Sequence, residues 1–127
     1  MPRDTDSGGR AARWGRETAA RLASSLGASD PAAASNECVL GGKRIVIKCA
    51  APKTDSVGVT YKMLDRLDEV LGAFQLDDGS FELLGLTPTH FRDGMRDSAG
   101  SGAGKTGLVR KEWFEQHGRP LGRVTLP

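Results

Sequence analysis

Apolar and polar residues alternate along residues 36–50, NECVLGGKRIVIKCA, which is the pattern of a β-hairpin. A two-residue turn at Gly41 and Gly42 would pair Glu37 with Val46. Side chains alternate across a strand, so the two faces carry different residues. One face carries Cys38, Leu40, Ile45, Ile47 and Cys49, and the other carries Glu37, Val39, Arg44, Val46 and Lys48. The first of these is predicted to be a core face.

Helices are predicted on both sides of the hairpin. Residues 1–9 are polar and are expected to form a disordered tail. A helix is expected from about Arg10 to Leu26, because small apolar residues and leucines follow one another at helical spacing and a glycine follows. A second helix is expected from about Val59 to Phe74, where apolar residues recur every three or four positions.

The C-terminal half is expected to add shorter elements. Residues 80–86, SFELLGL, are predicted to form a strand. Thr87 and Pro88 are typical of the cap and first turn of a short helix that continues to about residue 98. Residues 108–118 are predicted to be a strand that leads into a helical turn. Together these elements predict a single α/β domain, residues 10–127, with a small mixed sheet and a central β-hairpin flanked by helices.

Charge and length narrow the classes of function. The chain has 127 residues, a net charge of +2 and a pI near 8.7, which permits nucleic-acid binding. A chain of this length is small for a free-standing enzyme, so a homodimer or larger complex is an open alternative. No apolar run approaches the ~20 residues of a membrane span, so no membrane partner is expected and the expected location is cytoplasmic.

The polar face of the hairpin carries candidate chemistry. In the predicted register Glu37 lies diagonal to Lys48, at roughly 7 Å. A metal ion, a water molecule or a direct ion pair can bridge such a distance. An acid and a lysine on one face of a hairpin are therefore the first candidate site.

This pattern resembles the PD-(D/E)XK nucleases, the restriction-endonuclease-like superfamily, in which a helix with a glutamate precedes a hairpin with an acid and an acid-any-lysine motif. The resemblance maps onto Glu17 in the first helix, Glu37 in the first strand and Lys48 at the end of residues 46–48. It implies a restriction-endonuclease-like fold and a DNA endonuclease, a hydrolase that depends on magnesium or manganese. It further implies that Glu37 binds the metal, that Lys48 orients the attacking water and that Glu17 helps to position them.

The chain departs from this family at Val46, which occupies the position of the second metal-binding carboxylate. Asp55, Asp65 and Glu69 are alternative sources of that acid, and the sequence does not choose among them. A second hypothesis therefore keeps the fold and replaces catalysis by nucleic-acid binding or assembly. A third is a protein-interaction module, for which an exposed Trp113–Phe114 pair would be an anchor.

Several basic residues are candidates for phosphate contacts. They are Arg44, Lys53, Arg92, Arg96 and Lys105. Arg92 and Arg96 lie four residues apart on the predicted third helix, where they would form a clamp. Lys105 lies in residues 99–107, AGSGAGKTG, which satisfy a relaxed phosphate-loop pattern but lack the preceding buried strand. A glycine-rich loop that contacts a nucleic-acid backbone is the preferred interpretation.

The cysteines favour a reduced protein. Cys38 and Cys49 lie on the predicted core face but not opposite each other, so two free thiols are expected rather than a disulfide. Zinc would require both to converge with His90 and His117 without any paired ligand spacing, and this interpretation is not favoured.

Overall fold

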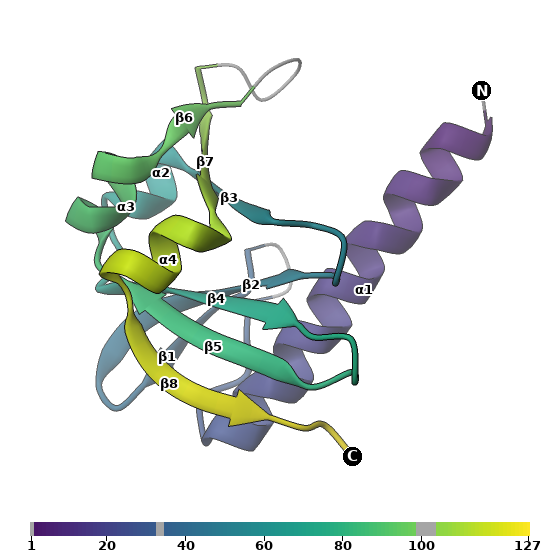
Figure 1. Ribbon diagram of the computed structural model, residues 1–127, viewed down its shortest axis with the longest axis horizontal. Coiled ribbons are helices and arrows are strands. Elements are labelled where there is room, and N and C mark those ends of the chain that lie inside the picture. The colour runs from purple at the N-terminus through teal and green to yellow at the C-terminus, as the bar shows by residue number, and fades with distance from the viewer. Residues whose placement is uncertain (1, 33–34, 99–103) are drawn as a thin grey trace.

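The computed structural model describes residues 2–32, 35–98 and 104–127, with side chains from residue 10 onward. The elements in chain order are α1 (Pro2–Leu26), β1 (Glu37–Leu40), β2 (Lys43–Ala50), β3 (Ser56–Thr60), α2 (Tyr61–Leu64), β4 (Glu69–Gln75), β5 (Phe81–Leu86), α3 (Pro88–Gly94), β6 (Arg96–Asp97), β7 (Thr106–Arg110), α4 (Lys111–His117) and β8 (Arg119–Val124). The fold is mixed α/β, as the sequence predicts (Figure 1).

The main sheet has the strand order β1-β2-β4-β5-β8. The β2–β4 pair is parallel and the other pairs are antiparallel. The hairpin has the predicted register, with Glu37 opposite Val46 and Leu40 opposite Lys43. Gly41 and Gly42 both have positive φ, at 59° and 81°, which is the conformation that a two-residue turn of this kind requires.

The two faces of this sheet pack against different layers. On one face α1 packs its small apolar residues, Ala19, Leu22 and Ala23, against Ile45 and Ile47 of β2. This confirms the predicted core face of the hairpin. The other face is covered by α4 and by residues of the smaller sheet, β3-β7-β6, together with α2 and α3 (Figure 1). The N-terminal half of α1 extends beyond the body of the domain (Figure 1).

The predicted helix over residues 59–74 is wrong. This segment forms the end of β3, the single-turn helix α2 and the strand β4. Residues 70–74 of β4 are buried on both faces of the sheet. Leu71 and Ala73 pack in the core cluster that includes α1, and Val70 and Phe74 pack in the cluster that includes α4 and the second sheet. A strand buried on both faces shows no alternation of apolar and polar residues, so its apolar residues also fit the helical spacing.

The predictions for the C-terminal half are largely confirmed. The strand β5 lies within the predicted range, and Thr87 caps α3 by accepting a hydrogen bond from the His90 N–H at 3.2 Å. The helix α3 is shorter than predicted and ends at Gly94. β7 leads into α4 as predicted, whereas β8 was not anticipated.

The first helix is longer than the sequence pattern indicates, since α1 begins at Pro2 rather than near Arg10. Its C-terminal end is as expected, with Gly27 at a φ of 77° just after Leu26. Across the described residues, no helix combines the length and apolar character needed to cross a membrane.

Candidate functional site

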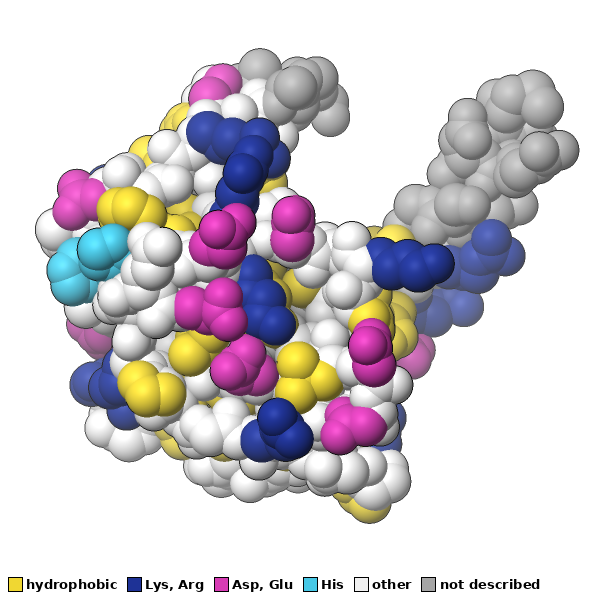
Figure 2. All heavy atoms as spheres, in the orientation of Figure 1, with side chains coloured by type: hydrophobic (Ala, Val, Ile, Leu, Met, Phe, Trp, Pro, Cys, Tyr) yellow, Lys and Arg dark blue, Asp and Glu magenta, His cyan; other side chains and the backbone are white. Residues whose placement is uncertain are grey.

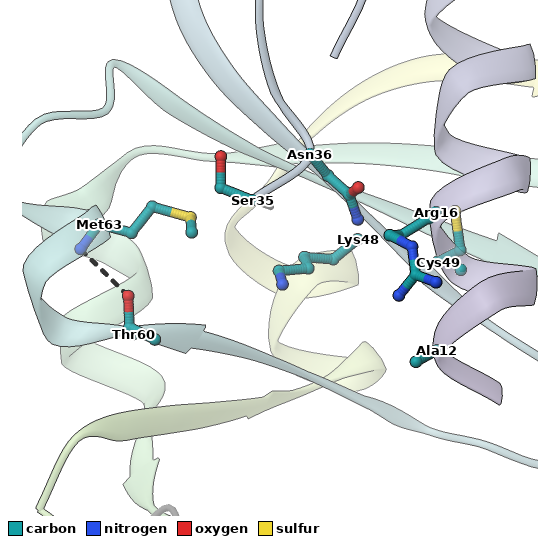
Figure 3. A pocket seen from close by; sticks show the side chains of 9 residues that line it. Ala12, Arg16, Ser35, Asn36, Lys48, Cys49, Thr60 and Met63 are labelled. Carbon is teal, nitrogen blue, oxygen red and sulfur yellow. Dashed lines mark hydrogen bonds between the residues drawn. The ribbon is translucent and has the colours of Figure 1, made fainter. Parts of the chain in front are cut away.

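A cavity of about 510 Å³ opens between α1, β2 and the β3–α2 junction. Its lining residues are Ala12, Gly15, Arg16, Ser35, Asn36, Lys48, Cys49, Thr60 and Met63. Arg16 comes from α1 and Lys48 from β2. The Lys48 ammonium group points toward Thr60 and Met63, and the Arg16 guanidinium lies on the α1 side of the cavity (Figure 3). We refer to it as the Arg16–Lys48 pocket.

The pocket exists because β1 is shorter than β2. β1 pairs only with residues 43–46, and Ile47 then donates its N–H to the Asn36 carbonyl at 3.4 Å. Residues 48 and 49 of β2 therefore extend past the end of β1, beside α1. Asn36 makes the entry to β1 with a φ of 61°, a left-handed conformation that asparagine tolerates better than most residues.

Lys48 is a partly buried cation. Burial lowers its pKa, and the neighbouring Cys49 and Glu37 act in the opposite direction. Among the described residues, those that line the pocket include two cationic side chains and no Asp or Glu. An anion that entered the pocket would stabilise the charged form of Lys48 and would compensate for its burial. The pocket is therefore electrostatically suited to an anionic group.

The polar side chains of the pocket complement these cations. Thr60 contributes a hydroxyl group and Asn36 an amide, whereas the Ser35 hydroxyl is engaged with Glu37, from whose backbone N–H it accepts a hydrogen bond at 3.4 Å. The Thr60 hydroxyl accepts a hydrogen bond from the Met63 N–H at 3.2 Å, as the cap of α2, so its own proton is left to donate. Hydroxyl, amide and guanidinium donors around one cavity can bind phosphate oxygens.

Glu37 has a different environment from Lys48, although the register places them on the same face of the hairpin. Arg66 donates to both carboxylate oxygens of Glu37, from Nε to Oε1 at 2.8 Å and from Nη2 to Oε2 at 2.7 Å. This bidentate contact lowers the pKa of Glu37 to about 2, against the opposing effect of burial. Glu37 is not among the residues that line the Arg16–Lys48 pocket.

Replacing Arg66 with glutamine should raise the pKa of Glu37 from about 2 toward its ordinary value of 4.5. Because the folded-state pKa is depressed, the ion pair stabilises the fold fully above pH 4.5, and this stabilisation is lost as the pH falls toward 2. Carboxyl ¹³C NMR titration of the wild type and Arg66→Gln measures this directly. Equal Glu37 titration midpoints in the two proteins would contradict the bidentate contact.

The other residues implied by the nuclease resemblance are separated. Glu17 is exposed on α1 and lines a smaller adjoining cavity of about 260 Å³ with Arg16 and Asn36. Val46 is fully buried in the core beneath the second sheet. The position in which the family has a carboxylate is thus filled here by a packing residue.

The three alternative acids also lie outside the lining of the Arg16–Lys48 pocket. Asp65 forms an ion pair with Arg92. Glu69 is 5% exposed and is bound by Arg119. It lies on β4 three residues before Gly72, which is the residue opposite Lys48 in the sheet. Asp55 is exposed, with its carbonyl accepting the Lys111 N–H. Within the described ranges, no three Asp, Glu, His or Cys side chains are arranged to hold a metal ion.

The predicted phosphate contacts do not form one surface with the pocket. Arg92 and Arg96 do not share a helix, because α3 ends at Gly94 and Arg96 lies in β6. Arg44, Lys53 and Lys105 are exposed, and none of them lines the pocket. Of the phosphate-loop pattern, residues 99–103 lie outside the described residues. Basic and acidic side chains are intermixed on the face shown in Figure 2.

Two further predictions concern the cysteines and the late aromatic pair. Cys38 and Cys49 are free thiols, as expected, and burial raises the pKa of Cys49 to about 12. Phe114 is fully buried, whereas Trp113 is partly buried and donates its indole N–H to the His90 carbonyl at 2.8 Å. The pair therefore does not form an exposed anchor.

Sequence reasoning missed the residues that define the pocket. Neither Arg16 nor Arg66, which holds Glu37, is among the candidate residues that the sequence predicts. Asn36, as a polar residue just before a strand, offered one signal, because Asn commonly takes left-handed conformations at such entries.

Comparison with known proteins supplies no relative. No protein-family model, curated protein or solved structure matches this chain.

Proposed function

We propose that this domain binds DNA through its backbone phosphates and that the Arg16–Lys48 pocket receives one of them. The observation that carries the proposal is the composition of the pocket, in which a guanidinium and a partly buried ammonium share one cavity with hydroxyl and amide donors. Phosphate contacts of this kind, made by Arg, Lys, Ser, Thr and Asn, position proteins on nucleic acids.

The proposal includes a restriction-endonuclease-like architecture in which the catalytic centre is degenerate. Three observations support binding over cleavage: Val46 is buried in the core, Glu37 is bound by Arg66, and none of the alternative acids lines the pocket with Lys48. A metal-dependent phosphodiesterase needs at least one carboxylate free to hold the cation. In this chain Lys48 is instead assigned to phosphate binding.

Arg16→Gln and Lys48→Met should each weaken binding to a short labelled DNA duplex by about tenfold at low salt, the scale of one charge-assisted hydrogen bond. Each should also reduce the slope of log affinity against log salt concentration by about 1, because one phosphate contact is lost. Fluorescence anisotropy over a salt series measures both quantities.

The matched control is Arg123→Gln, which removes an exposed arginine from β8 at the opposite edge of the sheet. It should leave the affinity and the slope close to those of the wild type. Equal losses of DNA affinity in all three variants would show that the net charge of the protein, and not the pocket, determines binding. Absence of DNA binding by the wild type at low salt would overturn the proposal.

A second candidate function is metal-dependent DNA cleavage, which the Glu37–Lys48 register favours. Release of Glu37 from Arg66 on substrate binding would free a carboxylate for Mg²⁺ or Mn²⁺. Plasmid cleavage assays with the wild type, Glu37→Gln and Lys48→Met distinguish the two functions. Metal-dependent cutting that both substitutions abolish would select the nuclease, and retention of DNA without cutting would select the binding domain.

A further inference from the structure

A second cationic cavity lies at the opposite end of β2 from Lys48. Its volume is about 310 Å³, at the lower end of the range of small-molecule sites. Its side chains come from β2, β4, α3, α4 and β8, which converge where β2, β4 and β8 begin. The residues that matter here are Lys43, Glu69, Thr87, His90, His117 and Arg119.

Arg119 is held in place by a carboxylate beneath it. Glu69 has a side chain only 7% exposed, and it accepts hydrogen bonds from Arg119 Nη2 at 2.7 Å and Nε at 3.2 Å. The Arg119 side chain is 55% exposed, so its outer edge remains open. A buried ion pair contributes little net stability, but it does fix an arginine before a ligand arrives.

The backbone is shaped around this ion pair. A Cβ at Gly85 would lie 2.4 Å from Oε2 of Glu69, so a side chain at this position would displace the carboxylate from where Arg119 holds it. A Cβ at Gly118 would meet the Phe114 carbonyl at 2.3 Å and the Gly85 carbonyl at 3.1 Å. The two glycines therefore allow β5, β8 and the carboxylate to approach closely on one wall of the cavity.

The remaining side chains supply more donors. His90 and His117 are exposed, with ring centroids 6.1 Å apart, and they form one patch on the surface (Figure 2). Trp113 packs against His117 with centroids 4.0 Å apart, which restrains that ring. Lys43 adds an exposed ammonium group from the start of β2.

We infer that this cavity is a binding site for a phosphate monoester. Glu69 is neutralised by Arg119, so the site presents Lys43, the outer N–H groups of Arg119 and two imidazoles to a ligand. With Arg119 neutralised by Glu69, Lys43 supplies the net positive charge. Its ammonium group, the outer N–H groups of Arg119 and the imidazoles can donate to three terminal oxygens, which a phosphate monoester offers and a diester, with two, does not. The inference does not depend on the Arg16–Lys48 pocket.

The test follows the ring ¹⁵N resonances of His90 and His117 during titration with inorganic phosphate, methyl phosphate and dimethyl phosphate. Inorganic phosphate and methyl phosphate should give saturable shifts, and dimethyl phosphate should bind about tenfold more weakly, the scale of one lost charge-assisted contact. Lys43→Gln should weaken the binding of methyl phosphate by a similar factor. Glu69→Gln should also weaken the binding of methyl phosphate without unfolding the protein, because the carboxylate that fixes the position of Arg119 is then absent.

Two control variants separate this site from general charge effects. Lys62→Gln removes an exposed lysine of α2, and Arg16→Gln removes a cation of the other pocket. Both should bind methyl phosphate as the wild type does. The inference is overturned if no saturable shift occurs, if inorganic phosphate alone binds, if Lys43→Gln has no effect, or if dimethyl phosphate binds as tightly as methyl phosphate.

Discussion

Replacing Phe114 with alanine is expected to destabilise the domain by about 3–5 kcal/mol. Phe114 is fully buried in α4, and its ring meets Phe74 and Phe91 edge-on, with centroids 5.2 Å and 6.3 Å apart. It also packs onto the backbone of Gly72, where an added Cβ would lie 3.0 Å from the ring. The substitution would leave a cavity at the centre of the layer that joins both sheets.

Urea denaturation followed by circular dichroism measures this loss. The control is Val39→Ala, because Val39 is 48% exposed on β1 and should change the free energy of unfolding by less than about 0.5 kcal/mol. A loss for Phe114→Ala as small as that of the control would mean that α4 does not pack on the sheet as described.

Arg119→Met is expected to destabilise the domain by about 2–3 kcal/mol, because the nearly buried Glu69 carboxylate loses the guanidinium that pairs with it. Methionine preserves most of the apolar stem of arginine, so lost packing contributes little. The same denaturation measurement applies.

The double variant Glu69→Gln/Arg119→Met isolates the cause of that loss. Removing the buried charge as well should recover part of the lost free energy of unfolding, as in a double-mutant cycle. Arg123→Met serves as the exposed control on the same strand. If the double variant were no more stable than Arg119→Met, an uncompensated carboxylate would not be the reason for the loss.

The register of the hairpin was predictable to the residue because the residues that determine it are neighbours in the sequence. Alternation over residues 37–40 and 43–50 fixes the faces, and Gly41 and Gly42 fix the register. Thr87 followed by Pro88 is equally local, and it correctly predicted the start of α3. These elements were assigned without any knowledge of distant contacts.

Elements that depend on tertiary contacts were not predictable. Residues 70–74 are all apolar or small, and so also fit helical spacing, because both faces of β4 are covered by packed layers. The Glu37–Arg66 contact spans 29 residues, and its effect on Glu37 has no sequence signature. The presence of Arg16 and Lys48 in the lining of one cavity likewise results from the packing of α1 against β2.

The relation between the two cationic cavities follows from β2 itself. Lys43 begins the strand and Lys48 lies near its end, five residues away, or roughly 17 Å at the rise of an extended chain. Each lysine contributes to a separate cavity. The same strand thus contributes a lysine to each proposed phosphate site. A substitution of one lysine removes a cation from one site and leaves the lining of the other unchanged.

The most direct test of the central proposal replaces single DNA phosphates by uncharged methylphosphonates and measures binding to the wild type, Arg16→Gln and Lys48→Met. At one position on the duplex, the neutral linkage should weaken wild-type binding by about tenfold more than it weakens binding of either variant, because each variant has already lost one of the two contacts to that phosphate. Equal losses for the wild type and both variants at every position would contradict a phosphate in the Arg16–Lys48 pocket.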